Sequence, residues 1–188
     1  MSTSVAVIRE NGAVAKRRHL PPAAIDASDA WLGRFHAAWD RARVGSLLPL
    51  RAAFDPVAVM RLSGGRVHIL ETSGDPSDYR FRLWGHMIDF DGGADYTDRR
   101  IADMPHAAMR LAALEDYGDA VAAGTPSYQL IYNFENGTEC TYARLLLPVT
   151  ADGRTVTHLL VAVNQRPIAE FAPEPAARPR PPLRLVGH

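Results

Sequence analysis

Histidines and aspartates are the side chains of this chain that could perform acid–base chemistry. His86 and His106 lie near Asp89 and Asp103 in the sequence, and a histidine beside a carboxylate can transfer protons near neutral pH. This supports one hypothesis, a small α+β enzyme or carrier that uses such a pair in a cone-shaped pocket. The sequence contains no Gly-x-Ser-x-Gly motif, phosphate-binding loop or dinucleotide fingerprint. We therefore predict a non-enzymatic protein and keep the enzyme as the alternative.

The remaining metal-ligating residue types are scattered. His68, His86 and His158 fall on predicted strands, but no His-x-His or His-x3-His spacing pairs them. The pattern predicts independent histidines on a solvated sheet face and no metal site. The single cysteine, Cys140, excludes an internal disulfide and a cysteine-based zinc cluster. On a predicted strand, it is typical of a small half-buried hydrophobe.

Composition and charge restrict the function further. The chain has 188 residues, of which 47% are hydrophobic and 22% charged, and this suits one domain with appendages. Its formal net charge is +0, so the basic excess of a nucleic-acid-binding domain is missing. We interpret the basic cluster 16–19 as a solvated flank, with a DNA-associated regulator using Lys16–Arg18 as a third hypothesis.

No window reaches the roughly 20 apolar residues of a membrane helix. The apolar run 5–8 is too short for a signal peptide. We expect a cytoplasmic protein with neither nucleic acid nor membrane as a partner.

The N-terminal part divides at residue 28. Residues 1–27 lack a sustained period and predict a flexible leader. Residues 28–46 predict an amphipathic helix. The helix could pack on its own domain, but because aromatic residues favour interfaces, we expect it to form a homodimer. The candidate interface residues are Trp31, Leu32, Phe35 and Trp39.

Residues 47–165 predict one domain in the order strand, strand, helical middle, three strands. The turn signals Asn136-Gly137 and Asp152-Gly153 join the last three strands. Residues 166–188, rich in proline and arginine, predict a disordered tail. The predicted strands begin at Val67, Tyr79, Tyr128, Tyr142 and Val156, and the main helix covers His106 to Ala123.

Over about residues 30–165 the chain resembles the stand-alone bacterial PAS-like proteins of the PAS_5 type. The resemblance rests on Tyr79-Arg-Phe-Arg-Leu-Trp-Gly, on 93–101, and on Tyr142-Ala-Arg-Leu-Leu-Leu-Pro-Val. It implies an α+β fold, a PAS-like five-stranded antiparallel sheet with short helices in the middle, preceded by the N-terminal amphipathic helix. It also implies a sensory or regulatory protein that binds a small ligand or a signalling partner.

In this fold a ligand pocket lies between the apolar face of the sheet and the helical middle. Methionines beside tyrosines would give an adaptable apolar wall with hydroxyl anchors, although the same residues could simply fill the core. The candidate lining residues are Phe81, Leu83, Met87, Ile101, Met104, Met109, Tyr128, Leu130, Tyr132 and Tyr142.

The sequence argues against the two coloured cofactors of such domains, and leaves the cofactor unknown. A flavin photosensor of this fold needs a reactive cysteine in a helical Asn-Cys-Arg-Phe-Leu-Gln-like segment, and Cys140 lies in no such segment. Haem needs a helical histidine as axial ligand, and His106 or His86 are the candidates. Since a single histidine is usually a surface or hydrogen-bonded residue, we do not assign haem.

Overall fold

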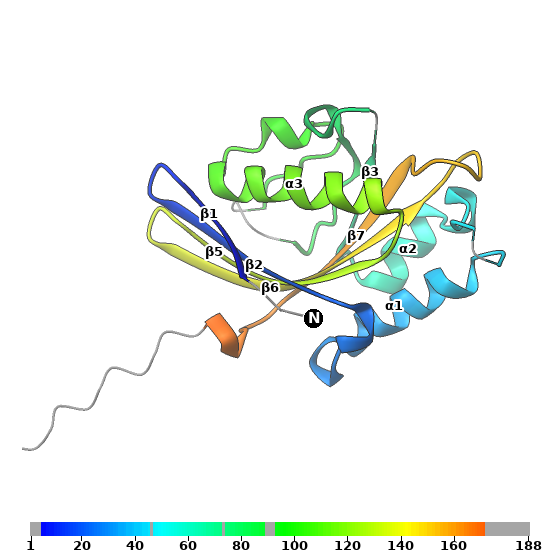
Figure 1. Cartoon of the computed structure of the whole chain (residues 1–188), viewed down its shortest axis with the longest axis horizontal. Helices are drawn as coiled ribbons and strands as arrows, with labels where there is room; N and C mark the ends of the chain where they lie inside the picture. The colour runs from blue at the N-terminus through cyan, green and yellow to red at the C-terminus, as the bar shows by residue number, and fades with distance from the viewer. Residues whose placement is uncertain (1–4, 46, 73, 89–92, 172–188) are drawn as a thin grey trace, which may run out of the picture.

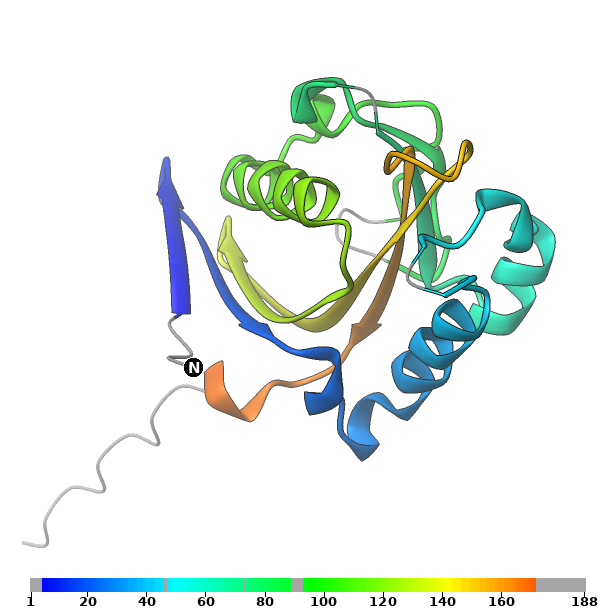
Figure 2. The same ribbon diagram turned by 45° about the vertical axis from the view of Figure 1, so that its right-hand side comes forward.

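The computed structural model describes residues 5–45, 47–72, 74–88 and 93–171. Within them the chain forms one antiparallel sheet of seven strands with helices on both faces (Figure 1). The sheet curves around the longest helix, and two shorter helices lie against its opposite face (Figure 2). The architecture is α+β, with one large apolar core on each side of the sheet.

The strands lie in the spatial order β1-β2-β5-β6-β7-β3-β4, and every neighbouring pair is antiparallel. Their bounds are β1 Val5–Glu10, β2 Ala13–Leu20, β3 Val67–Glu71, β4 Arg80–Leu83, β5 Ser127–Glu135, β6 Thr138–Val149 and β7 His158–Gln165. The α-helices are α1 Ala30–Arg41, α2 Pro56–Ser63 and α3 Ala107–Ala123. Short 3-10 helices occur at η1 Pro22–Ala24, η2 Ala27–Asp29, η3 Arg51–Ala53, η4 Pro76–Asp78, η5 Ile101–Asp103 and η6 Ala169–Phe171.

The prediction of five strands is wrong, because the supposed flexible leader 1–27 contains two more. Residues 5–20 form the hairpin of β1 and β2, and β2 pairs along β5 from Val14↔Phe134 to Leu20↔Tyr128. The turn between them is Asn11–Gly12, with φ of 49° and 83°. These left-handed angles suit a two-residue hairpin, as at the predicted turn Asn136–Gly137.

Small and charged residues on the buried side of β2 hide this hairpin in the sequence. Ala13, Ala15 and Arg17 are its buried positions, so the period of two is present without large apolar residues. The alanines face Ala108 and Ala112 of α3, which lets the helix lie close to the hairpin. Arg17 is buried, so the basic cluster is a structural part of β2 and not the solvated flank that we predicted.

A bulge in β4 changes which side chains face the helix. Ile69 pairs with Leu83 and Leu70 with Phe81, so Arg82 is one extra residue on β4. An extra residue reverses the alternation of side chains beyond it. Phe81 therefore lies in the core beneath α3, whereas Leu83 packs against the core on the opposite face.

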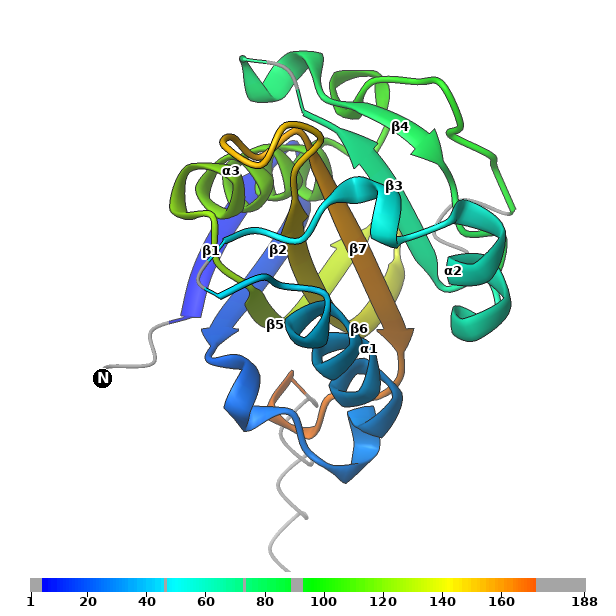
Figure 3. The same ribbon diagram turned by 90° about the vertical axis from the view of Figure 1, so that its right-hand side faces the viewer.

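The helix α1 covers its own sheet. Leu32, Phe35 and Trp39 are buried against β6 and β7, and the indole nitrogen of Trp39 donates a hydrogen bond of 2.7 Å to the carbonyl of Pro148. Figure 3 shows α1 and α2 side by side over this face. Trp31 is half-buried. Three of the four predicted dimer contacts are therefore inside the chain and unavailable to a second copy.

The C-terminal boundary also differs from the prediction of a tail starting at residue 166. Arg166 donates hydrogen bonds to the carboxylate of Asp29, and Ile168 is buried. Glu170 of η6 forms an ion pair with Arg18 of β2. Residues 166–171 thus belong to the folded part, while the rest of the predicted tail lies outside the described residues.

Candidate functional site

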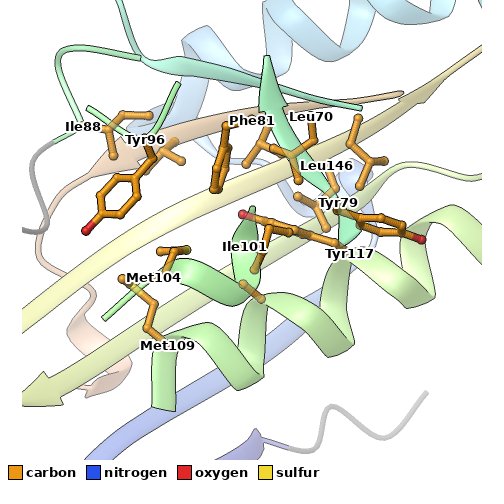
Figure 4. Packing of buried hydrophobic residues seen from close by; sticks show 14 of the residues in the cluster. Leu70, Tyr79, Phe81, Ile88, Tyr96, Ile101, Met104, Met109, Tyr117 and Leu146 are labelled. Atoms are coloured by element: carbon orange, nitrogen blue, oxygen red, sulfur yellow. The ribbon is translucent and has the colours of Figure 1, made fainter. Parts of the chain in front are cut away.

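Half of the ten predicted pocket residues lie together between α3 and the sheet. They share the apolar core that Figure 4 shows around Met104, Met109 and Tyr117. The members of the predicted set found in this core are Phe81, Ile101, Met104, Met109 and Tyr142.

The other five residues do not line this space. On β5, Ile131 faces α3 opposite Tyr142, so the neighbouring positions Tyr128 and Leu130 face the other core. The predicted face of β5 was therefore displaced by one residue. The remaining members are Leu83 on the opposite face, Met87, which is 57% exposed, and Tyr132, which is half-buried and donates a hydrogen bond to Glu139.

Beneath α3 the core contains a small cavity of about 20 Å³. A cavity must have roughly 10–15 Å³ to hold one water molecule, so this space has room for about one. Its wall is mainly aromatic and sulfur-containing, with two buried polar side chains among them. The lining residues are His68, Phe81, Trp84, Met104, Met109, Ala113, Tyr117, Tyr142, Arg144 and Val163.

His68 is a polar group of the cavity that is neutral at physiological pH. Burial, followed by the positive charge of Arg144, lowers the pKa of His68 to about 3. Its Nδ1 accepts a hydrogen bond of 3.0 Å from the backbone N–H of Gly85, so the ring hydrogen resides on Nε2. The indole of Trp84 stacks on the imidazole with 3.7 Å between ring centroids. The prediction of a solvated sheet face is wrong for this histidine.

Arg144 is the charged group of the cavity, and its guanidinium is held on several sides. It donates one hydrogen bond to the carboxylate of Asp116 and another, of 2.7 Å, to Oε1 of Gln129. It also lies over the ring of Tyr117, 4.9 Å from the centroid. Burial raises the pKa of Asp116, but the charge of Arg144, a hydrogen bond with His19 and the charge of Arg17 outweigh it and keep that pKa below its usual value.

Asp116 also holds the N-terminal hairpin. Arg17 donates a hydrogen bond of 3.0 Å to Asp116 and a second of 3.0 Å to the backbone carbonyl of Ala112. The second terminal nitrogen of Arg17, Nη2, lies 2.8 Å from the carboxylate of Glu115. A continuous chain of contacts therefore runs from the cavity through Arg144 and Asp116 to β2.

A second hollow, of about 60 Å³, lies at the start of α3. Nδ1 of His106 lies 2.8 Å from Oε2 of Glu135, a carboxylate that was not among the predicted partners of this histidine. Asp103 pairs with Arg100 instead. His86 is exposed, and Asp89 lies outside the described residues. The hollow is lined by His106, Met109, Asn133, Glu135, Thr138 and Cys140.

Sequence reasoning missed His68, Trp84, Tyr117 and Arg144 as cavity residues. Arg144 stands inside the apolar string Tyr142–Val149, and a charge within a buried strand was the available signal. Across the described ranges, no cluster of three or more His, Cys, Asp or Glu residues could hold a metal ion. Nor does that part of the chain contain a helix long and apolar enough to cross a membrane.

The spatial order β5-β6-β7-β3-β4, with a helical segment between β4 and β5 packed on one face, defines a sensor domain of the PAS class. The sequence model of the PAS_5 family, described as a PAS domain, matches residues 29–163, and the chain belongs to this family. Family membership indicates a sensory or regulatory role, and PAS domains are generally non-enzymatic. Neither a curated protein nor a solved structure shows significant similarity to the chain. The hairpin of β1 and β2 lies outside the matched range.

Proposed function

We propose that this chain is a PAS-type sensory protein that binds a small, mainly apolar ligand between α3 and the sheet. The observation that carries the proposal is the position of Met109, which lines both the inner cavity and the outer hollow. A methionine side chain is unbranched and adapts its shape easily. Rotation of this one side chain would join the two spaces into a pocket that opens beside the His106–Glu135 pair.

The polar groups of the cavity define the chemistry of the ligand. Nε2 of His68 carries the ring hydrogen, and no described residue accepts a hydrogen bond from it. The guanidinium of Arg144 adds positive charge to a wall that is otherwise aromatic and aliphatic. A small aromatic or aliphatic molecule with one hydrogen-bond acceptor, neutral or anionic, matches this wall.

The response passes through Arg144, because this residue belongs both to the cavity and to the contact with Asp116. A ligand that draws Arg144 toward itself weakens the ion pair between Arg144 and Asp116. Because Asp116 also pairs with Arg17, the contact between α3 and the hairpin changes as well. The hairpin then changes its stability on the sheet, and a signalling partner protein reads that change. A homodimer stays part of the proposal, through a surface other than the buried face of α1. A single species at the chain mass of 20.6 kDa in concentrated solution, measured by light scattering, would contradict it.

The first test compares the native mass of the purified protein with its denatured mass and records the absorption spectrum. Mass lost on denaturation identifies a bound ligand, and the spectrum tells whether it is haem or flavin. In parallel, phenol is titrated into the wild type and into Met109→Ala, which enlarges the pocket, while thermal unfolding is followed. Leu111→Ala is the control, because Leu111 lies on the exposed side of the same helix.

We expect phenol to raise the melting temperature of Met109→Ala more than that of the wild type, with Leu111→Ala resembling the wild type. A native mass equal to a multiple of the chain mass, together with no response to phenol in any of the three proteins, would overturn the ligand proposal.

The alternative of a small enzyme or carrier has one supporting observation, the His106–Glu135 pair in the outer hollow. The pair is surrounded by Met109, Asn133, Thr138 and Cys140 among the described lining residues. Its position between the start of α3 and the end of β5 supports a closing contact. If the pair closes the pocket, adding His106→Gln to the Met109→Ala variant should accelerate the binding of phenol without changing the affinity for phenol. An acid–base role predicts no change in this rate.

A further inference from the structure

The layer formed by residues 30–66, which contains α1 and α2, has an unusually apolar outer surface. Nine large hydrophobic residues are exposed in the described part of the chain, and five of them lie in this layer. Leu62 of α2 is 79% exposed and Val44, just after α1, is 76% exposed. The set is Val44, Leu47, Leu50, Val57 and Leu62. Apolar exposure concentrated in this way marks an interaction surface.

The same layer is strongly basic. Residues 30–66 contain six arginines, two aspartates and no lysine or glutamate, a net charge of +4 in a chain whose formal net charge is +0. The net charge of zero for the whole chain is therefore the sum of a positive layer and a negative remainder. The arginines are Arg34, Arg41, Arg43, Arg51, Arg61 and Arg66.

Three of these arginines are available to a partner. Arg34, Arg41 and Arg61 are exposed, and no carboxylate among the described residues pairs with them. In contrast, Arg43 lies 3.3 Å from the carboxylate of Asp40, and Arg51 donates to a backbone carbonyl. The layer therefore exposes both aliphatic side chains and guanidinium groups.

We propose that this layer, which we call the basic–apolar face, docks an acidic amphipathic segment of a partner protein. Guanidinium groups pair with carboxylates in a fixed two-pronged geometry, and leucine and valine side chains on the partner would cover the exposed aliphatic residues. The charge of the face requires aspartate and glutamate flanking the apolar positions of that segment.

Two other kinds of partner fit the face less well. Duplex nucleic acid would neutralise the arginines but leave the aliphatic residues in water. Membrane-surface helices combine Lys or Arg with Trp, Phe and Leu, whereas none of the exposed large hydrophobic residues of the layer is aromatic. Trp39 is buried, and the half-buried Trp31 lies beneath the guanidinium of Arg66, 5.3 Å from its ring.

The face is connected to the interior of the protein by shared strands. The buried side of α1 packs on β6 and β7, whose opposite sides supply Tyr142, Arg144 and Val163 to the cavity. Docking on the outer layer and occupancy of the cavity thus act on the same two strands. The inference itself depends only on the surface of the layer, and holds whether or not a ligand enters the cavity.

The test uses the full chain and a fluorescent 18-residue peptide with leucines at i, i+3, i+4 and i+7 and glutamates at the flanking positions. Binding is followed by fluorescence anisotropy at low and high salt. Arg61→Glu and Leu62→Ser are the variants of the face. Arg9→Glu and Val7→Ser are the matched controls, because Arg9 and Val7 are exposed on β1, outside the layer.

We expect the acidic peptide to bind, and each variant of the face to weaken its affinity about fivefold or more, since one contact of this kind contributes about 1 kcal/mol. The controls should change it less than twofold, and salt should weaken it. Four results would each overturn the proposal: no binding, equal binding of a peptide with lysine in place of glutamate, binding of the chain to anionic phosphatidylglycerol vesicles that Leu62→Ser abolishes, or self-association that Leu62→Ser abolishes.

Discussion

Nη1 of Arg17 lies 3.0 Å from Oδ1 of Asp116, although 99 residues separate them, and both side chains are almost fully buried. This ion pair connects the hairpin, which lies outside the matched PAS range, with the helix that covers the cavity. Because the second oxygen of Asp116 accepts from Arg144, one carboxylate compensates two buried guanidinium groups. The folded state of the hairpin and the polar wall of the cavity thus depend on the same residue.

Asp116→Asn should strongly destabilise the protein. The substitution leaves Arg17 and Arg144 buried without their shared negative charge, and breaking a buried pair in this way costs about 3–5 kcal/mol. Urea unfolding measures the loss. Asp119→Asn, at an exposed position of the same helix, should change the free energy of unfolding by less than about 0.5 kcal/mol. Similar values for the two variants would contradict the role of Asp116.

The buried imidazole of His68 should make stability depend on pH. Its folded pKa of about 3 lies below the value of about 6.5 in an unfolded chain, so the unfolded state binds one more proton between these values. Its contribution to stability is complete above about pH 6.5 and falls by about 1.4 kcal/mol per pH unit as the pH decreases toward 3.

The measurement is urea unfolding of the wild type and His68→Gln at several values between pH 6.5 and 4.5. The glutamine oxygen can still accept from the N–H of Gly85, but it does not titrate. The slope of the wild type should exceed that of the variant by about 1.4 kcal/mol per pH unit. Parallel slopes would show that His68 is not the buried neutral group described above.

Phe35→Ala should destabilise the chain without changing its oligomeric state. Phe35 is buried against the protein's own sheet, and removal of such a ring costs about 3–5 kcal/mol. Light scattering should give the same mass as for the wild type at a concentration where both are folded. The neighbouring exposed substitution Arg34→Ala serves as the stability control. A folded variant with half the wild-type mass would restore α1 as a dimer interface.

Gly85→Ala should disrupt the junction between β4 and β3. A Cβ at this position would lie 2.6 Å from the carbonyl oxygen of Gly65 and 2.9 Å from that of Val67, and backbone atoms cannot withdraw as flexible side chains do. The expected loss is more than about 2 kcal/mol of unfolding free energy. Gly33→Ala is the matched control, because its nearest heavy atom would be 3.6 Å away and alanine favours a helix over glycine. A destabilised control together with an unaffected Gly85→Ala would contradict this packing.

The sequence predicted what local signals specify. Asn136–Gly137 identified the β5–β6 hairpin, and the apolar spacing within residues 28–46 identified α1. In contrast, the bulge at Arg82 and the face of Tyr128 depend on pairing with distant strands, so alternation alone assigned both incorrectly.

Charged residues explain most of what was missed in the candidate site. Arg17, Arg144 and Asp116 are all hydrophilic by type, and any pattern method places them in solvent. They are buried because they neutralise one another, and this cancellation involves residues 28 to 99 positions apart. A local window contains one partner at a time and therefore predicts a surface residue.

Because it includes the hairpin of β1 and β2, the folded domain is larger than the range of residues that matches the family. A protein shortened to begin at residue 29 would keep every matched residue, yet the hydrogen-bonding edge of β5 and the alanine side of α3 would be uncovered. An uncovered strand edge recruits strands from other molecules and promotes aggregation. Anyone who transplants this sensor into an artificial signalling protein should therefore carry the first twenty residues with it, and attach the new effector elsewhere.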